Sequence, residues 1–193
     1  MSPFEIMMQE HRIIEIVLNC LSEMISDVMT QRKLKFFHAE NSINFFRYYA
    51  DRFHHCKEED RLFNIVTERG IPEELEFVKD LKEEHERGRG FVKGMDKAFR
   101  DAAHGSSDML MKFAQSGRDY IDLLRGHILK EDRVFFPMLI KSFSADDMKR
   151  LVDSFENLDI DDVDQLTGKR YPHIANELAL IYNVNIDDIS EEL

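Results

Sequence analysis

Two strong helix-breaking sequences divide the first 143 residues of this chain. Gly70-Ile71-Pro72 combines a glycine stop with a proline start, and residues 104–107 read His-Gly-Ser-Ser. At the N-terminus, Ser2-Pro3-Phe4-Glu5 has the serine, proline and glutamate of a capping box. Between these points apolar residues follow a helical period, and we expect a kink near Pro137. The predicted helices cover residues 3–29, 33–68, 72–103 and about 107–143.

Four helices of this length, joined by short turns, must lie antiparallel to bury their apolar stripes, which predicts an up-down-up-down four-helix bundle. The two breaks disfavour a single long coiled coil. From Ser144 the pattern changes: Ser144 caps a short helix with Asp147 three residues on, an acidic loop follows, and Pro172 starts a helix that ends near Tyr182. We therefore expect an all-α protein, with the bundle over residues 1–143 and a small helical C-terminal extension over residues 144–193.

The charge of the chain excludes several classes of partner. Its 193 residues include 38 acidic and 26 basic side chains, for a formal net charge of −12. Nucleic acid and anionic membrane surfaces both need a basic face, so neither is an expected partner. No apolar run approaches the roughly 18 to 20 residues of a membrane span, and the N-terminus does not resemble a secretory signal. Only two cysteines, Cys20 and Cys56, fit a reducing compartment, so we expect a cytoplasmic protein.

One motif occurs in both the second and the fourth predicted helix. Residues 54–63 and 127–136 align without a gap as H-x-x-K-E-[ED]-x-x-[LVF]-F. In each copy a histidine and a glutamate are four residues apart, so both side chains project from one helix face.

These faces are apolar, and each of the four helices places one histidine in its apolar stripe. The stripes are Met7, His11, Ile14, Leu18, Leu21 and Ile25; Ile43, Ala50, His54, Glu58 and Ile65; Val78, Leu81, His85, Val92 and Phe99; and Leu123, His127, Glu131, Val134 and Met138. A lone core histidine is usually structural. Four of them with two buried glutamates are different, because a buried carboxylate without a partner costs several kcal/mol. A bound metal supplies the missing positive charge.

The donor set selects the kind of metal. Four imidazoles and two carboxylates are too many for one tetrahedral zinc ion and too rich in nitrogen for calcium or magnesium. They suit two transition-metal ions bridged by the carboxylates, about 3.5 to 4 Å apart. We expect two iron ions joined by an oxo or hydroxo group, with manganese or zinc as substitutes.

The pattern H…HxxxE…H…HxxxE resembles that of hemerythrin-like HHE cation-binding proteins, over residues 1–143. Glu10-His11, Glu84-His85 and both motif copies carry the resemblance, which is closest to the bacterial four-histidine branch. It implies a non-haem di-iron centre in the bundle core. The metal ligands it implies are His11, His54, Glu58, His85, His127 and Glu131.

The chain departs from the oxygen-carrying hemerythrins at one position. Those proteins have a fifth histidine one turn after the histidine of the third helix, where this chain has Arg89. The four-histidine set moves the interpretation toward proteins that bind or sense O2, NO, peroxide or iron itself. The alternative is a di-iron oxidoreductase that turns over peroxide or nitric oxide, or repairs iron–sulfur clusters. A third possibility is a metal-free helical adaptor, in which the convergence of the six polar residues in the core would be a coincidence.

Three further residues are candidates for positions next to the metals. Tyr120, two turns before His127, is either a core residue or a donor to iron. Arg89 either pairs with a ligand glutamate, gates small anions, or is solvated. His55 is an interhelical hydrogen-bonding residue or the main rival for ligand status. The extension, in which residues 171–178 are the most structured, either docks a protein partner or caps the bundle.

Overall fold

The computed structural model describes residues 1–104, 106, 108–156 and 162–185, and every regular element in that part of the chain is helical. The α-helices are α1 (Pro3–Gln31), α2 (Phe36–Phe45), α3 (Phe63–Arg69), α4 (Pro72–Ala103), α5 (Asp108–Lys130), α6 (Phe136–Ser142), α7 (Ala145–Glu156) and α8 (Asp162–Tyr182). Three π-helical segments occur within the described ranges: η1 (Phe46–His55), η2 (Glu58–Leu62) and η3 (Glu131–Phe135). The prediction of an all-α protein is confirmed.

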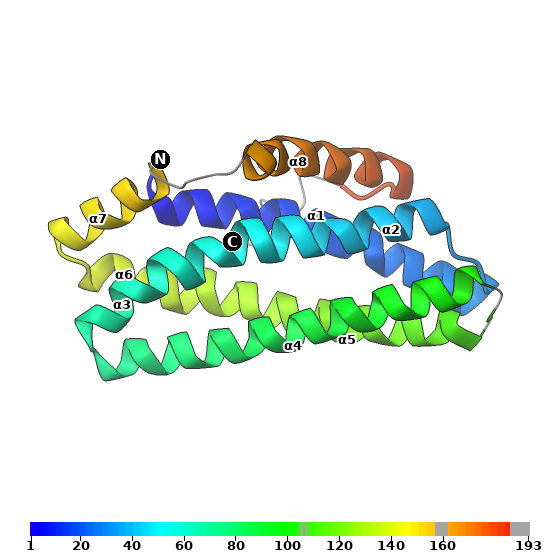
Figure 1. Ribbon diagram of the computed structural model, residues 1–193, viewed down its shortest axis with the longest axis horizontal. Coiled ribbons are helices and arrows are strands. Elements are labelled where there is room, and N and C mark those ends of the chain that lie inside the picture. Colours follow the sequence, from blue (N-terminus) through cyan, green and yellow to red (C-terminus); the bar gives the residue numbers. More distant parts are fainter. Residues whose placement is uncertain (105, 107, 157–161, 186–193) are drawn as a thin grey trace.

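Four long helical segments, α1, α2 to α3, α4, and α5 to α6, lie side by side along the long axis of the molecule (Figure 1). The ends of the first three agree with the capping signals in the sequence. The side chain of Ser2 accepts a hydrogen bond from the backbone of Glu5, and the Glu5 carboxylate accepts one from the backbone of Ser2 at 2.7 Å. Gly70 ends α3 with a φ of 68°, a left-handed conformation that favours glycine.

The two segments that carry the repeated motif are not continuous α-helices, contrary to expectation. In each copy a π-turn begins at the motif glutamate, Glu58 or Glu131. Pro137 follows η3, but the equivalent position after η2 is Asn64, so the proline is not the common cause. The shared feature is the buried glutamate. Single π-turns inside α-helices are frequent at functional sites, and here they occur where the core becomes polar.

The π-turn changes which residues face the core. Because a π-turn contains more residues than an α-turn, it delays the return of the chain to the same face. Val134, expected in the apolar stripe, is 48% exposed, whereas Phe135 is fully buried. The prediction for Val134 is therefore wrong, because it assumed a constant helical period.

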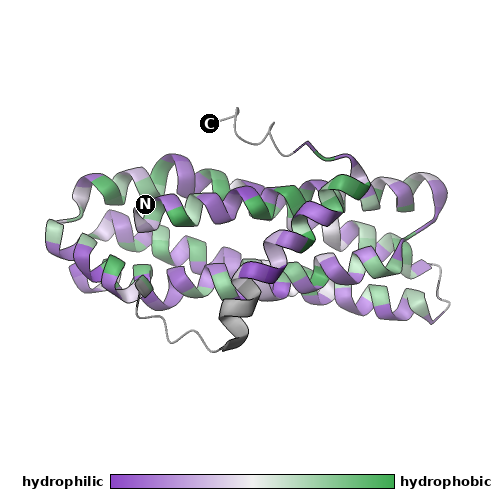
Figure 2. Cartoon of the chain, turned by 90° about the horizontal axis from the view of Figure 1, so that it is seen from above, coloured by the Kyte–Doolittle hydropathy of each residue, from purple (hydrophilic) through white to green (hydrophobic). Residues whose placement is uncertain are grey.

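The apolar core forms two clusters with a polar layer between them. One cluster contains Ile14, Ala50, Val92 and Ile128, and the other contains residues such as Phe4, Leu62, Leu81 and Phe135. Along every long segment the predicted ligand histidine lies between a residue of one cluster and a residue of the other. Figure 2 shows hydrophilic and hydrophobic residues alternating along each of the long helices.

The C-terminal extension packs on the outside of the long segments. Its cap is as predicted, with the backbone of Asp147 donating to Ser144 Oγ at 3.1 Å. In α7, Leu151 is fully buried, and α8 lies along α1 and η1 and buries Tyr171 and Leu178 (Figure 1). Pro172 lies inside α8 rather than at its start, so that prediction is wrong. Residues 157–161 of the predicted acidic loop are outside the described ranges.

The boundary at residue 143 stays a prediction. Among the described helices, none combines the length and the apolar character needed to span a membrane.

Candidate metal centre

The structure brings all six predicted ligand residues together in the polar layer of the core. Each side chain comes from a different element, and each residue is at most 2% exposed. They are His11 of α1, His54 of η1, Glu58 of η2, His85 of α4, His127 of α5 and Glu131 of η3. Because helices from both ends of the sequence contribute, only the folded bundle assembles this set.

The four imidazoles form two pairs whose Nε2 atoms face each other. His11 and His54, the His11 pair, have Nε2 atoms 2.9 Å apart. His85 and His127, the His85 pair, have Nε2 atoms 3.2 Å apart. Imidazole nitrogens at these separations, directed toward a common centre, are arranged as donors to a shared cation.

The two glutamates lie between the pairs. Glu58 places Oε1 3.6 Å from Nε2 of His54 and Oε2 3.4 Å from Nε2 of His85. Each oxygen of this carboxylate therefore faces a different pair. Glu131 Oε2 is 3.3 Å from Nε2 of His11 and 3.2 Å from Nε2 of His127. Glu58 thus approaches the two pairs through different oxygens, whereas Glu131 approaches both through the same oxygen.

The chemistry of the two glutamates fits a bound metal. Their four carboxylate oxygens are fully buried and have no hydrogen-bond partner among the described residues. Burial raises the pKa of Glu58, and the nearby charge of Glu131 raises it further. Burial also opposes ionisation of Glu131, but His127 and His11 outweigh it and hold its pKa well below the usual range. Divalent cations would satisfy both carboxylates at once.

Two groups of donor atoms in the described part of the chain are close enough to hold an ion. One comprises His11, His54, Glu58 and Glu131, and the other comprises His55, Glu58, His85 and His127. Glu58 belongs to both groups, in agreement with a bridging position.

Each of the four histidines is held by a carboxylate on its outer nitrogen. The pairs, measured from Nδ1, are His11 with Asp132 at 2.7 Å, His54 with Glu10 at 2.9 Å, His85 with Glu59 at 2.6 Å and His127 with Glu84 at 3.0 Å. A carboxylate only accepts, so Nδ1 carries the proton and Nε2 presents its lone pair to the centre. The orientation of every imidazole is thus set by a neighbouring helix.

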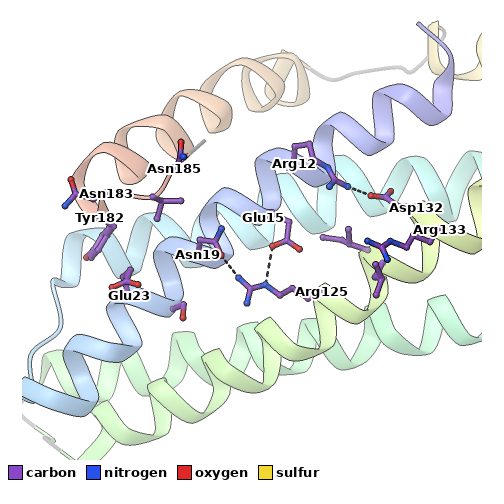
Figure 3. A pocket seen from close by; sticks show the side chains of 14 residues that line it. Arg12, Glu15, Asn19, Glu23, Arg125, Asp132, Arg133, Tyr182, Asn183 and Asn185 are labelled. Carbon is purple, nitrogen blue, oxygen red and sulfur yellow. Dashed lines mark hydrogen bonds and ion pairs between the residues drawn. The ribbon is translucent and has the colours of Figure 1, made fainter. Parts of the chain in front are cut away.

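A basic side chain contacts each of these carboxylates in turn. The pairs are Arg12 with Asp132, Lys57 with Glu10, Arg89 with Glu59 and Lys130 with Glu84. Figure 3 shows the first, with Arg12 of α1 directed toward Asp132 of η3. At His11 the neighbouring carboxylates also raise the basicity of the imidazole. Burial lowers the pKa of His11, but Asp132 and Glu131 outweigh it and raise the pKa to about 9.

These contacts explain the repeated motif. In both copies the histidine and the first glutamate face the centre. The motif lysine, Lys57 or Lys130, contacts the glutamate that precedes a histidine on another helix. The last acidic residue, Glu59 or Asp132, holds a histidine of another helix. Every polar position of H-x-x-K-E-[ED] therefore has a contact in the centre.

The roles of Glu10, Glu59, Glu84 and Asp132 are not evident from helical faces alone, and the sequence analysis missed them. A signal was nevertheless present. Lysine and the second acidic residue recur at the same places in both motif copies, and both Glu10 and Glu84 directly precede a histidine. Solvated surface positions would not have to repeat in this way.

Arg89 contacts neither of the two buried glutamates. It donates to Glu59 at 2.7 Å, to Asp51 at 2.8 Å and to Glu86 at 2.7 Å. The residue that replaces the fifth histidine therefore supports the carboxylate that holds His85.

His55 lies beside the centre, with its ring stacked on that of His85. The ring centroids are 3.9 Å apart and the planes differ by 9°. The stacked rings hold their lone pairs in separate, near-parallel planes, although a ring nitrogen of His55 belongs to the same donor group as His85 and His127. Burial, together with the nearby His85, lowers the pKa of His55 to about 4, so the imidazole is neutral at pH 7.

Tyr120 is buried and packs its ring on Phe46 with centroids 4.8 Å apart. Burial raises the pKa of its hydroxyl above the ordinary value, so the phenol is protonated. The ring borders a cavity that reaches His85 and His127. The sequence predicted that Tyr120 is either a core residue or a donor to iron, and its packed position agrees with a core residue next to the centre.

Comparison with known proteins gives one match. The family model described as the hemerythrin HHE cation-binding domain matches residues 2–139. No match was found among curated proteins or among solved structures. The matched region contains all six buried donor residues and both motif copies, and it covers well over half of the chain. The chain therefore belongs to the hemerythrin HHE cation-binding family.

Proposed function

We propose that this protein holds two iron ions in the polar layer of an up-down-up-down helical bundle and binds or senses O2, NO or peroxide there. One observation carries the proposal: two buried glutamates without a hydrogen-bond partner among the described residues lie between two pairs of carboxylate-held histidines. Iron, when bound, supplies redox chemistry and an exchangeable coordination position. The formal net charge of −12 disfavours nucleic acid as a partner.

The residues of the chain have distinct tasks in this function. His11, His54, His85 and His127 would each direct one nitrogen at an ion, and Glu58 and Glu131 would bridge. Glu10, Glu59, Glu84 and Asp132 hold the imidazole protons at Nδ1. The two apolar clusters above and below exclude bulk water, which strengthens electrostatic interactions inside the layer.

A second function, a di-iron oxidoreductase acting on peroxide or nitric oxide or in iron–sulfur cluster repair, is favoured by a different feature. A cavity reaches His85 and His127 from outside the bundle, and repeated turnover needs such a path for exchange. A binding or sensing protein forms a lasting adduct, whereas an enzyme consumes its ligand repeatedly.

The test is elemental analysis of protein purified without air from iron-supplemented cells. We expect two irons per chain in the wild-type protein and about none in the double variant that carries both Glu58→Ala and Glu131→Ala. The control variant, Glu40→Ala, changes an exposed glutamate of α2 and should keep two irons. Anaerobic addition of NO or peroxide to the loaded protein then separates a stable spectral adduct from turnover. Absence of iron from the wild-type protein would refute the proposed function.

A further inference from the structure

A cavity of about 360 Å³ opens beside the His85 pair, between α4, α5 and η1. Its lining includes three buried histidines, His55, His85 and His127. Apolar side chains of these elements form much of its wall, and five charged residues also line it: Arg47, Asp51, Glu84, Arg89 and Lys93. The cavity thus joins the candidate metal centre to a mainly apolar space.

The volume is far larger than a diatomic molecule or hydrogen peroxide requires. It equals the liquid volume of about twelve water molecules. Cavities of about 300 to 1,000 Å³ with apolar walls and a few convergent polar groups are typical of sites for small organic molecules. The walls here include Phe46, Val92, Tyr120 and Leu124, all of which are buried.

His55 provides an unused polar group in the cavity lining. Its side chain is buried, and neither ring nitrogen has a hydrogen-bond partner among the described residues. The nearest carboxylate oxygen, Oδ1 of Asp51, is 3.6 Å from Nδ1, which is beyond hydrogen-bond distance. A buried imidazole left in this way is costly unless a ligand satisfies it.

The stacking of His55 on His85 separates its role from that of the predicted ligands. The near-parallel rings place the lone pairs of the two imidazoles in separate planes, so His55 can face the cavity while His85 faces the centre. A neutral imidazole offers one donor and one acceptor, which matches a hydroxyl or hydroperoxyl group.

We infer that this cavity binds a small organic molecule with an apolar body and one hydroxyl-like polar end, which hydrogen-bonds to His55. Within the function proposed above, on which this part rests, the natural ligand class is an organic hydroperoxide, with its polar end toward the His85 pair. The apolar walls favour a ligand whose body is apolar.

The test uses 2-phenyl-2-propanol, the alcohol counterpart of an aromatic hydroperoxide, and isopropylbenzene, which lacks the hydroxyl. Binding to the full chain, with and without iron, is followed by calorimetry and by chemical shifts. Leu123→Trp fills the cavity from α5 and should weaken alcohol binding by roughly tenfold or more. Leu129→Trp is the matched control, because Leu129 is an exposed residue of the same helix that does not line this cavity.

His55→Phe keeps a ring against His85 and removes both nitrogens. We expect this variant to bind the alcohol about three- to tenfold more weakly, to bind the hydrocarbon as the wild type does, and to keep its iron content. His55→Gln should restore part of the preference for the alcohol.

Several outcomes would overturn the inference. They are no saturable binding of the alcohol to the wild type, equal binding by the Leu123→Trp variant, or loss of iron from His55→Phe, which would make His55 a ligand. If the wild-type protein binds the alcohol but takes up no iron on purification from iron-supplemented cells, the proposed function is refuted and the cavity assignment stands.

Discussion

The His11 pair and the His85 pair use the same kinds of residue but differ in their surroundings. Behind the His11 pair, Asp132 and Glu10 are 9% and 7% exposed, and Lys57 is 5% exposed. The ring of His11 also stacks on Phe136, with centroids 5.8 Å apart. This half of the centre is enclosed by packed side chains.

The His85 pair is more open. The side chains of Glu59 and Glu84, which hold its histidines, are 26% and 19% exposed, and the basic partners Arg89 and Lys130 are about as exposed as Glu59. The 360 Å³ cavity reaches both of its histidines. A larger groove of about 700 Å³ lies near the other pair, but its lining includes Arg12 and Asp132 and neither His11 nor His54 (Figure 3).

The comparison teaches that equal donor sets do not make equal metal positions. The two motif copies place the same groups on the centre, and the difference arises one layer further out, in burial and in the cavity. We expect ligand exchange at the His85 pair and structural support from the His11 pair.

The largest effect is expected where the two halves join. Glu58→Ala removes the carboxylate shared by both donor groups, so the iron content should fall to one or less per chain and the melting temperature of the iron-loaded protein should fall. The metal-free protein should instead gain about 1 to 3 kcal/mol, because a buried carboxylate without a partner is gone. Elemental analysis and urea denaturation measure the two effects. Unchanged iron content in both Glu58→Ala and Glu131→Ala would contradict the bridging assignment.

The two motif lysines should separate the halves by stability. Lys57→Met removes the basic partner of the buried Glu10, so we expect a loss of about 3 to 5 kcal/mol in the free energy of unfolding. Lys130→Met removes a half-exposed partner of Glu84 and should cost about 1 kcal/mol or less. Denaturant titration of each variant gives both values. Equal losses would show that the two halves are equally enclosed.

Arg89→His tests the open half directly. The change adds an imidazole one turn after His85 and releases Glu59 from its basic partner. We expect autoxidation, or decay of the ligand adduct, to slow by roughly three- to tenfold, followed by the visible spectrum. Arg87→His, an exposed position on the same helix, is the control. An Arg89→His rate equal to that of the control would remove Arg89 from the account of this half.

The smallest effect concerns the π-turn of the second motif copy. Val134→Arg makes this copy match Arg61 of the first one. Because Val134 is 48% exposed, the free energy of unfolding should change by less than about 0.5 kcal/mol. A loss above about 2 kcal/mol in thermal or urea denaturation would place Val134 in the core and contradict the register of η3.

Much of the molecule follows from the sequence. Local signals such as the Ser2 cap, Gly70 and Pro72 determined helix ends, because capping and backbone conformation depend on a few neighbouring residues. The helical period placed all six candidate ligands on core faces, since side chains four residues apart share a face. Their actual ligand roles stay a prediction.

Tertiary structure alone decided the rest. Some features join residues far apart in the chain, such as the pairing of Glu10 with His54 and the stacking of His55 on His85. The burial of Tyr171 depends on how α8 packs on the bundle. The exposure of Val134 depended on a π-turn at a buried glutamate, which a constant period does not contain. Periodicity reports which face of a helix is apolar, whereas the contacts behind each ligand depend on which helix packs there and how closely.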